Sequence, residues 1–172
     1  MPTSLKSFLP SLGLCLGYSS SALYERQRVL VSLGLLHPER GRGPGSGVRL
    51  TPEAVATMIC CLMATDNLSE TAERVRTVCN AASSKRCRLT GEQRFLAALT
   101  KIISDKALAS AVNSVHVDRD RCSGSISFYR GRNFFTFFTR NRSNSSAPIS
   151  THASLGDDTL RAVVEKLQGV IQ

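Results

Sequence analysis

The feature that most constrains this chain is a glycine-rich stretch lying between the end of one helix and the start of another. Gly34 follows an apolar run, at a position where glycine takes the left-handed conformation that ends a helix. Residues 51–53, Thr-Pro-Glu, supply a capping hydroxyl, a proline for the first helical position and an acid for the first turn. The sequence between them predicts two short strands, at residues 36–40 and 48–50, joined by a tip too rich in glycine to pack into a core.

This stretch is also basic, with arginines on both arms of the predicted hairpin. Ahead of it, Ser19, Ser20 and Ser21 offer caps for a helix over residues 22–33, whose outer face carries further polar side chains. Guanidinium groups bind phosphate oxygens bidentately, and arginine or glutamate on a helix can contact guanine or cytosine. A helix followed by a two-stranded basic wing is the layout of winged helix-turn-helix DNA-binding domains. The candidate DNA-binding residues are Ser21, Tyr24, Glu25, Arg28, Arg40, Arg42 and Arg49.

The net charge of +9 and the pI near 9.7 favour a polyanionic partner. Residues 1–52 carry six basic against two acidic residues, residues 53–90 five against four, and residues 91–172 eleven against seven. Two basic lobes flank a nearly neutral middle. We therefore expect a DNA-binding domain at 1–80, a linker at 81–90, where the helical periodicity ends, and a second domain at 91–172.

The rest of the chain predicts helices and a small antiparallel sheet, which places the protein in the α+β class. Residues 5–12 have helical spacing, but Pro10 predicts a short helix or one broken at Leu9, and a turn at 13–17. Further helices, the first of them amphipathic, are expected at 52–63, 66–79, 91–104, 105–111 and 155–171. A strand is expected at 115–121 and a hairpin from strands at 125–129 and 133–139. In the second domain these helices flank the sheet.

Little in the sequence predicts catalysis or a cofactor. Asp118 and Asp120 alternate with Arg119 and Arg121, which on a strand puts the acids on one face and the bases on the other. This pattern predicts a solvated edge strand in preference to a carboxylate pair that binds metal. The six cysteines include no C-x-x-C pair. We expect no enzyme activity, no metal and no cofactor.

No apolar run reaches the roughly 20 residues that span a bilayer, and serines and Pro10 stand where a signal peptide would be apolar. We therefore expect a reducing cytoplasm and no membrane partner.

Residues 22–56 resemble the N-terminal winged-helix domain of the MerR-type regulators. The matching residues, in order, are Gly34-Leu35-Leu36, Pro38, Arg40, Gly47-Val48-Arg49-Leu50 and Thr51-Pro52-Glu53-Ala54-Val55. The resemblance implies that the helix ending near Leu33 and the wing bind DNA. The chain departs from the family in its recognition region, where it has Tyr24-Glu25-Arg26-Gln27, and in its longer, glycine-rich wing. It also lacks the family's long dimerisation helix and effector domain.

The expected function is that of a bacterial or phage-type transcriptional regulator. It would bind double-stranded DNA through a recognition helix at about 22–33 and a wing at about 37–50. The paired aromatics at 134, 135, 137 and 138 put apolar groups on both faces of a strand, so residues 91–172 are expected to hold a homodimer or another transcription protein. Two alternatives remain open: an excisionase-like or architectural accessory protein, and a basic module that binds acidic proteins.

Overall fold

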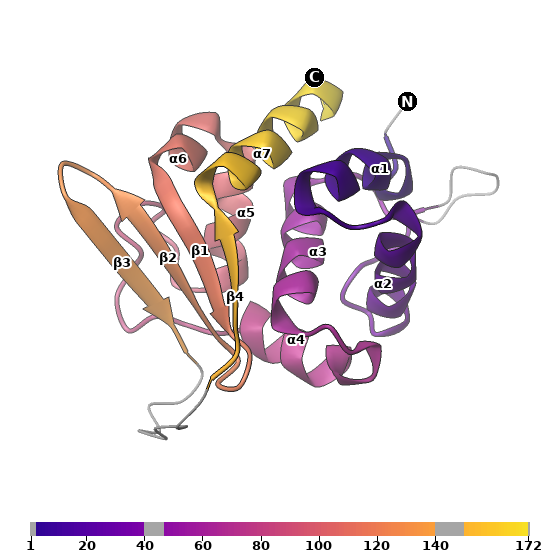
Figure 1. Cartoon of the computed structure of the whole chain (residues 1–172), viewed down its shortest axis with the longest axis horizontal. Coiled ribbons are helices and arrows are strands. Elements are labelled where there is room, and N and C mark those ends of the chain that lie inside the picture. The colour runs from indigo at the N-terminus through magenta and orange to yellow at the C-terminus, as the bar shows by residue number, and fades with distance from the viewer. Residues whose placement is uncertain (1–2, 40–46, 140–149, 172) are drawn as a thin grey trace.

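The computed structural model describes residues 3–39, 47–139 and 150–171. The chain has an α+β fold in which helices come first and a four-stranded antiparallel sheet, flanked by a C-terminal helix, comes last (Figure 1). The helices are α1 (Leu5–Leu16), α2 (Ser20–Ser32), α3 (Pro52–Ala64), the 3-10 turn η1 (Leu68–Glu70), α4 (Thr71–Cys79), α5 (Phe95–Ser104), α6 (Lys106–Ala111) and α7 (Asp157–Ile171). The strands are β1 (Val112–Asp118), β2 (Ser123–Tyr129), β3 (Asn133–Phe138) and β4 (His152–Gly156).

Helix α1 runs through Pro10 and ends only at Gly17, so the predicted break at Leu9 and turn at 13–17 are wrong. An interior proline costs about 3 kcal/mol, but Leu5, Phe8, Leu9 and Leu12 are all buried along one face of this helix. Burying each such side chain contributes about 1.5–3 kcal/mol. Burial of this face therefore outweighs the backbone hydrogen bond that proline removes.

The predicted helices α2 and α3 are confirmed, and each of their ends lies within two residues of the expected position. Ser19 caps α2 by accepting a hydrogen bond from the amide of Ala22 at 3.2 Å, and Gly34 beyond its end is left-handed with φ 67°. Thr51 caps α3 in the same way, and Pro52 occupies its first turn. The α4 segment begins with the 3-10 turn and becomes α-helical at Thr71.

Helix α3 lies at the centre of the molecule and is not the amphipathic helix that the sequence predicts. Every residue from Ala54 to Ala64 is buried. Figure 1 shows the reason: α3 lies between α1 and α2 on one side and α5 with the sheet on the other. A helix with neighbours on both sides has no solvated face to keep polar.

The predicted linker at 81–90 has no helix or strand, but it is not simply a surface loop. Ala81, Cys87 and Thr90 are buried, and Ala82 pairs with Thr139 at the end of β3. The following helix begins at Phe95 instead of residue 91, because Gly91 is left-handed with φ 79° and Arg94 is still extended, where it pairs with Ala82. One continuous cluster of buried residues runs from α1 to α7, while the division into two domains stays a prediction.

The sheet has the strand order β3-β2-β1-β4. The β2–β3 hairpin is confirmed, with Gly131 left-handed in its turn. Strand β4 is not predicted by the sequence pattern, which instead extends the final helix back to residue 155; that helix starts at Asp157. Gly124 of β2 lets the sheet approach α5, since a Cβ there would lie 2.6 Å from the ring of Phe95.

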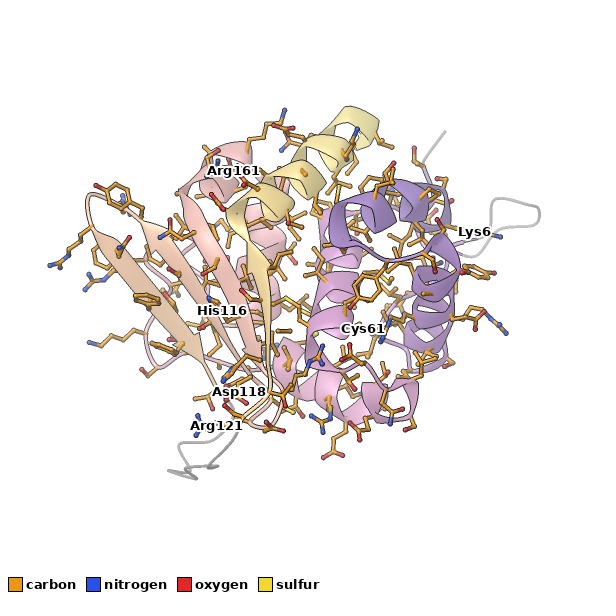
Figure 2. The ribbon with its side chains drawn as sticks, in the orientation of Figure 1. Lys6, Cys61, His116, Asp118, Arg121 and Arg161 are labelled. Carbon is orange, nitrogen blue, oxygen red and sulfur yellow. The ribbon has the colours of Figure 1, made fainter. Side chains whose placement is uncertain are left out.

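The end of β1 corrects the expectation for the acidic and basic residues at 118–121. The strand stops at Asp118 and is central, paired with both β2 and β4, so it is no edge strand. The Asp118 carboxylate accepts hydrogen bonds from the amides of Asp120 and Arg121, both at 3.0 Å. These residues form a tight turn (Asp118 and Arg121 are labelled in Figure 2), so the predicted two-faced arrangement does not exist.

Candidate nucleic-acid interface

Helices α1 and α2 form a compact pair joined by residues 17–19. Gly17, with φ 74°, ends α1, and Ser19 begins α2. The connection folds back tightly on α1: the amide of Tyr18 donates to the Gly13 carbonyl at 3.1 Å, and a Cβ at Gly13 would lie 2.4 Å from the Tyr18 carbonyl oxygen. Glycine at position 13 is therefore what allows the two helices to approach.

Helix α2 separates into a buried face and an exposed stripe. Its buried residues are Leu23, Arg26, Gln27 and Leu30. Its exposed stripe consists of Ser21, Glu25, Arg28 and Ser32. These four follow the spacing of one face of an α-helix and are not covered by any described residue.

The stripe carries an ion pair at its centre. The Arg28 guanidinium lies 3.3 Å from both carboxylate oxygens of Glu25, and both side chains are more than half exposed. Ser21 lies one turn earlier, with its hydroxyl 3.1 Å from that of Ser19. Because an exposed pair at this spacing is worth only about 0.3–0.5 kcal/mol, either charge can turn to another partner at little cost.

Tyr24 is half-buried beside the stripe and is covered by a residue that the sequence did not single out. The Lys6 ammonium of α1 lies 4.8 Å from the centre of the Tyr24 ring, a cation–π contact. The sequence could have identified Lys6, since the apolar spacing of α1 puts this residue on the outward side of the helix. Figure 2 shows Lys6 at the side of the molecule formed by α1 and α2.

The base of the predicted wing is described at residues 36–39 and 47–50, and we call these residues the loop base. Pro38 pairs with Val48, and the Glu39 amide donates to the Gly47 carbonyl at 3.2 Å. The loop base forms isolated bridges there, not the full strands that the sequence predicts. The chain start adds a third arm: the amide of Leu5 donates to Val48 at 2.7 Å, and that of Leu50 donates to Thr3 at 2.9 Å.

Alternation along the second arm of the loop base leaves Arg49 exposed between buried Val48 and Leu50. The Arg49 guanidinium lies 3.8 Å from the Glu39 carboxylate, and both are largely solvated. Arg40 and Arg42 lie outside the described residues. Of the predicted site, the structure therefore locates Ser21, Tyr24, Glu25 and Arg28 on α2 and Arg49 on the loop base.

A cleft of about 480 Å³ separates α2 from the loop base. Its lining brings together Lys6, Tyr24 and Arg28 with Pro38 and Val48 of the loop base. The structure thus places two elements that are separate in sequence on one side of the molecule, with positive side chains between them.

One buried side chain, Arg26, fixes α2 against the rest of the protein. Arg26 donates to the carbonyls of Thr65 at 3.1 Å and Asp66 at 3.2 Å, just beyond the end of α3. Burial raises the pKa of the neighbouring Cys61 thiol, and the Arg26 charge partly offsets that rise. Arg26 therefore holds the position of α2 and does not face an external partner.

The described residues contain no group of three or more histidine, cysteine, aspartate or glutamate side chains placed to hold a metal ion. Within the same residues, no helix is both long enough and apolar enough to cross a bilayer. Comparisons with protein-family models, with curated proteins and with solved structures found no match to this chain.

Proposed function

We propose that the protein is a sequence-specific regulator of transcription that binds double-stranded DNA through a winged helix-turn-helix. In this proposal α2 is the recognition helix and residues 37–50 are the wing. The observation that carries it is the exposed stripe of Ser21, Glu25, Arg28 and Ser32, which lies beside the anchored loop base. The proposed function uses no catalytic group and no cofactor. We place the protein in the cytoplasm, with the nucleoid of a bacterium or of a phage-infected cell.

The connection between α1 and α2 supports a helix-turn-helix, because such motifs join two helices by a short turn that often contains glycine. Here the turn has three residues and Gly17 provides the left-handed position. In this class the second helix lies in the major groove and the first crosses the backbone. The stripe on α2 would then contact base edges, while Lys6 on α1 lies where a phosphate contact is expected.

The loop base supports a second contact with the same duplex. It is tied by backbone hydrogen bonds to the start of α1, so it moves with the helix pair. Arg49 projects from it, and the chain between its arms contains Arg40 and Arg42. Arginines that flank a glycine-rich tip suit phosphate contacts, which fix the protein on DNA without reading sequence.

The test is a selection of bound sequences from a random duplex pool, followed by affinity measurements over a range of salt concentrations. Arg28→Ala should cost about 1–3 kcal/mol at one base pair of the selected site. Arg49→Ala and the Arg40→Ala, Arg42→Ala pair should weaken binding to all duplexes. They should also reduce the salt slope by about one unit for each phosphate that the protein no longer neutralises.

A matched control is Arg161→Ala in α7. Arg161 is an exposed arginine paired within its own helix, 2.9 Å from Asp157, as Arg28 is paired with Glu25. Figure 2 shows it on α7, away from Lys6 and the α1–α2 side. Equal decreases in affinity from Arg161→Ala and Arg28→Ala would mean that only net charge matters, and failure to enrich any duplex would overturn the proposal.

An accessory protein of the excisionase-like or architectural kind would use the same helix and wing. It would bend the duplex instead of recruiting or blocking polymerase. Genomic footprinting separates the two, since a few promoter sites favour a regulator and the end of a mobile element favours an accessory protein. A basic module that binds acidic proteins would show no duplex selectivity in the same assay.

A further inference from the structure

The sheet has one face that no described residue covers. Helices pack on its inner face (Figure 1). There Phe138 meets Phe95 of α5 edge to face, with the ring centres 5.5 Å apart. On the outer face Phe135 and Phe137 are 60% and 67% exposed, and their rings stack on each other at 6.3 Å. The alternation predicted for this strand is therefore confirmed, and it leaves two phenylalanines in contact with solvent.

The strand register defines the rest of this surface, which we call the open face. Phe137 lies beside Ser125, which lies beside His116, and Phe135 lies beside Ser127, which lies beside Ser114. The open face thus has the Phe135 and Phe137 rings at the β3 edge, exposed Tyr129 on β2, and serines with His116 across the neighbouring strands. The exposed rings make one side of this surface more apolar than an ordinary solvated surface, while its polar groups make it unlike a protein core.

We infer that the open face is where a second copy of this chain binds. The first argument is charge. The chain carries +9 overall, yet the strand positions facing this side include no lysine or arginine. Their one acid, Asp118, is occupied by the amides of its own turn. A nucleic-acid platform needs cations beneath the phosphates, whereas two highly positive chains approach most easily through an uncharged surface.

The second argument is area, and it sets the strength of the contact. Four strands of about six residues cover roughly 350 Å² at the spacings of a β-sheet. A standard stable interface needs about 800 Å² from each partner. The open face alone therefore supports a weak pair in solution, with a Kd on the order of tens of micromolar, and not an obligate dimer.

A weak contact of this kind suits two molecules held on one duplex. When each copy binds its own half-site, the second contact becomes intramolecular and its effective concentration reaches the millimolar range. This benefit rests on the proposed function, but the contact between the two sheets does not depend on it. The proposed DNA binding and the contact between two open faces can therefore be disproved separately.

The experiment is sedimentation equilibrium of the full chain, without DNA, over a concentration series that reaches about 200 μM, above the expected Kd. The average mass of the natural protein should rise above the 18.6 kDa monomer. The double variant Phe135→Ser, Phe137→Ser should stay at the monomer mass. Higher salt should strengthen association of the natural protein, because it screens the repulsion between two positive chains.

The matched control is Leu14→Ser, which removes an 86% exposed leucine from α1 and should leave association unchanged. Circular dichroism checks that each variant is folded, and all three substituted side chains are exposed. A natural protein that stays monomeric throughout, or an equal decrease in association from Leu14→Ser, overturns the inference. So does oligothymidylate binding that the double phenylalanine variant abolishes, since the open face would then be a single-strand platform.

Discussion

Arg119, just past the end of β1, reaches across to Asp66, just past the end of α3, and joins the sheet to the helical part of the molecule. Its guanidinium binds both carboxylate oxygens of Asp66, one of them at 3.0 Å. The same side chain donates to the Met63 carbonyl at 3.0 Å and to the Leu62 carbonyl at 3.4 Å. Arg119 therefore satisfies carbonyls at the C-terminus of α3, where a helix leaves them without internal partners and a positive charge is favoured.

Replacing Arg119 should destabilise the fold much more than replacing its acidic partner. Arg119→Ala leaves partly buried carbonyls unpaired and should lower the free energy of unfolding by about 2–3 kcal/mol. Asp66→Ala removes only a carboxylate whose side chain is 66% exposed, and should cost less than about 1 kcal/mol. Urea denaturation of the two variants measures both values, and a larger decrease from Asp66→Ala would contradict this assignment.

The same contact gives stability a dependence on pH. The hydrogen bond from Arg119 lowers the pKa of Asp66, and burial opposes it only in part. A carboxyl whose folded pKa is depressed contributes stability above its unfolded pKa of about 3.9, and this stability is lost as pH falls through the folded pKa. Asp66→Asn should therefore unfold with a shallower acid dependence below about pH 4 than the natural protein. Identical acid slopes would contradict the prediction.

Local rules of sequence predicted much of this fold. Capping at Ser19 and Thr51, the left-handed glycine at position 34 and the β2–β3 hairpin all appear as expected. Each depends on residues within a few positions of one another. The stripe on α2 was predictable for the same reason, since helical spacing alone places Ser21, Glu25 and Arg28 together.

The predictions that proved wrong depend on contacts between segments that are far apart in the sequence. The break at Pro10 did not occur because the apolar face of α1 packs against the core, and α3 became fully buried because other elements cover both of its sides. Arg26 and Arg119 bind carbonyls about 40 and 56 residues away. No periodicity in the sequence distinguishes such arginines from those that are exposed.

Gly124 should be intolerant of even one added methyl group. An alanine Cβ would lie 2.6 Å from two atoms of the Phe95 ring, which is fully buried and packs against Phe138. Overpacking of this kind costs about 1–3 kcal/mol. Gly156→Ala at the end of β4 is the control, because a Cβ there meets nothing within 4 Å. Denaturant midpoints of the two variants should differ clearly, and Phe95→Leu should recover part of the stability that alanine at position 124 removes.

Glu25 should act on sequence preference and on general affinity in opposite directions. Its carboxylate lies 3.3 Å from Arg28 on the exposed stripe, so in the proposed complex it faces a base pair beside the one that Arg28 contacts. Glu25→Gln removes a negative charge from the approaching surface and should tighten binding to random duplex. It should also cost discrimination at one base pair, by about 1–3 kcal/mol, because glutamine is a poorer acceptor for the cytosine amine. Single-base-pair variants of the selected duplex, measured at two salt concentrations, separate the two effects.

The control is Asp157→Asn in α7, which removes the acid of a similar helical pair, with Arg161 at 2.9 Å. This variant should change neither the affinity for random duplex nor the discrimination at a single base pair. A Glu25→Gln protein with an unaltered sequence preference would reduce this residue to a partner that orients Arg28.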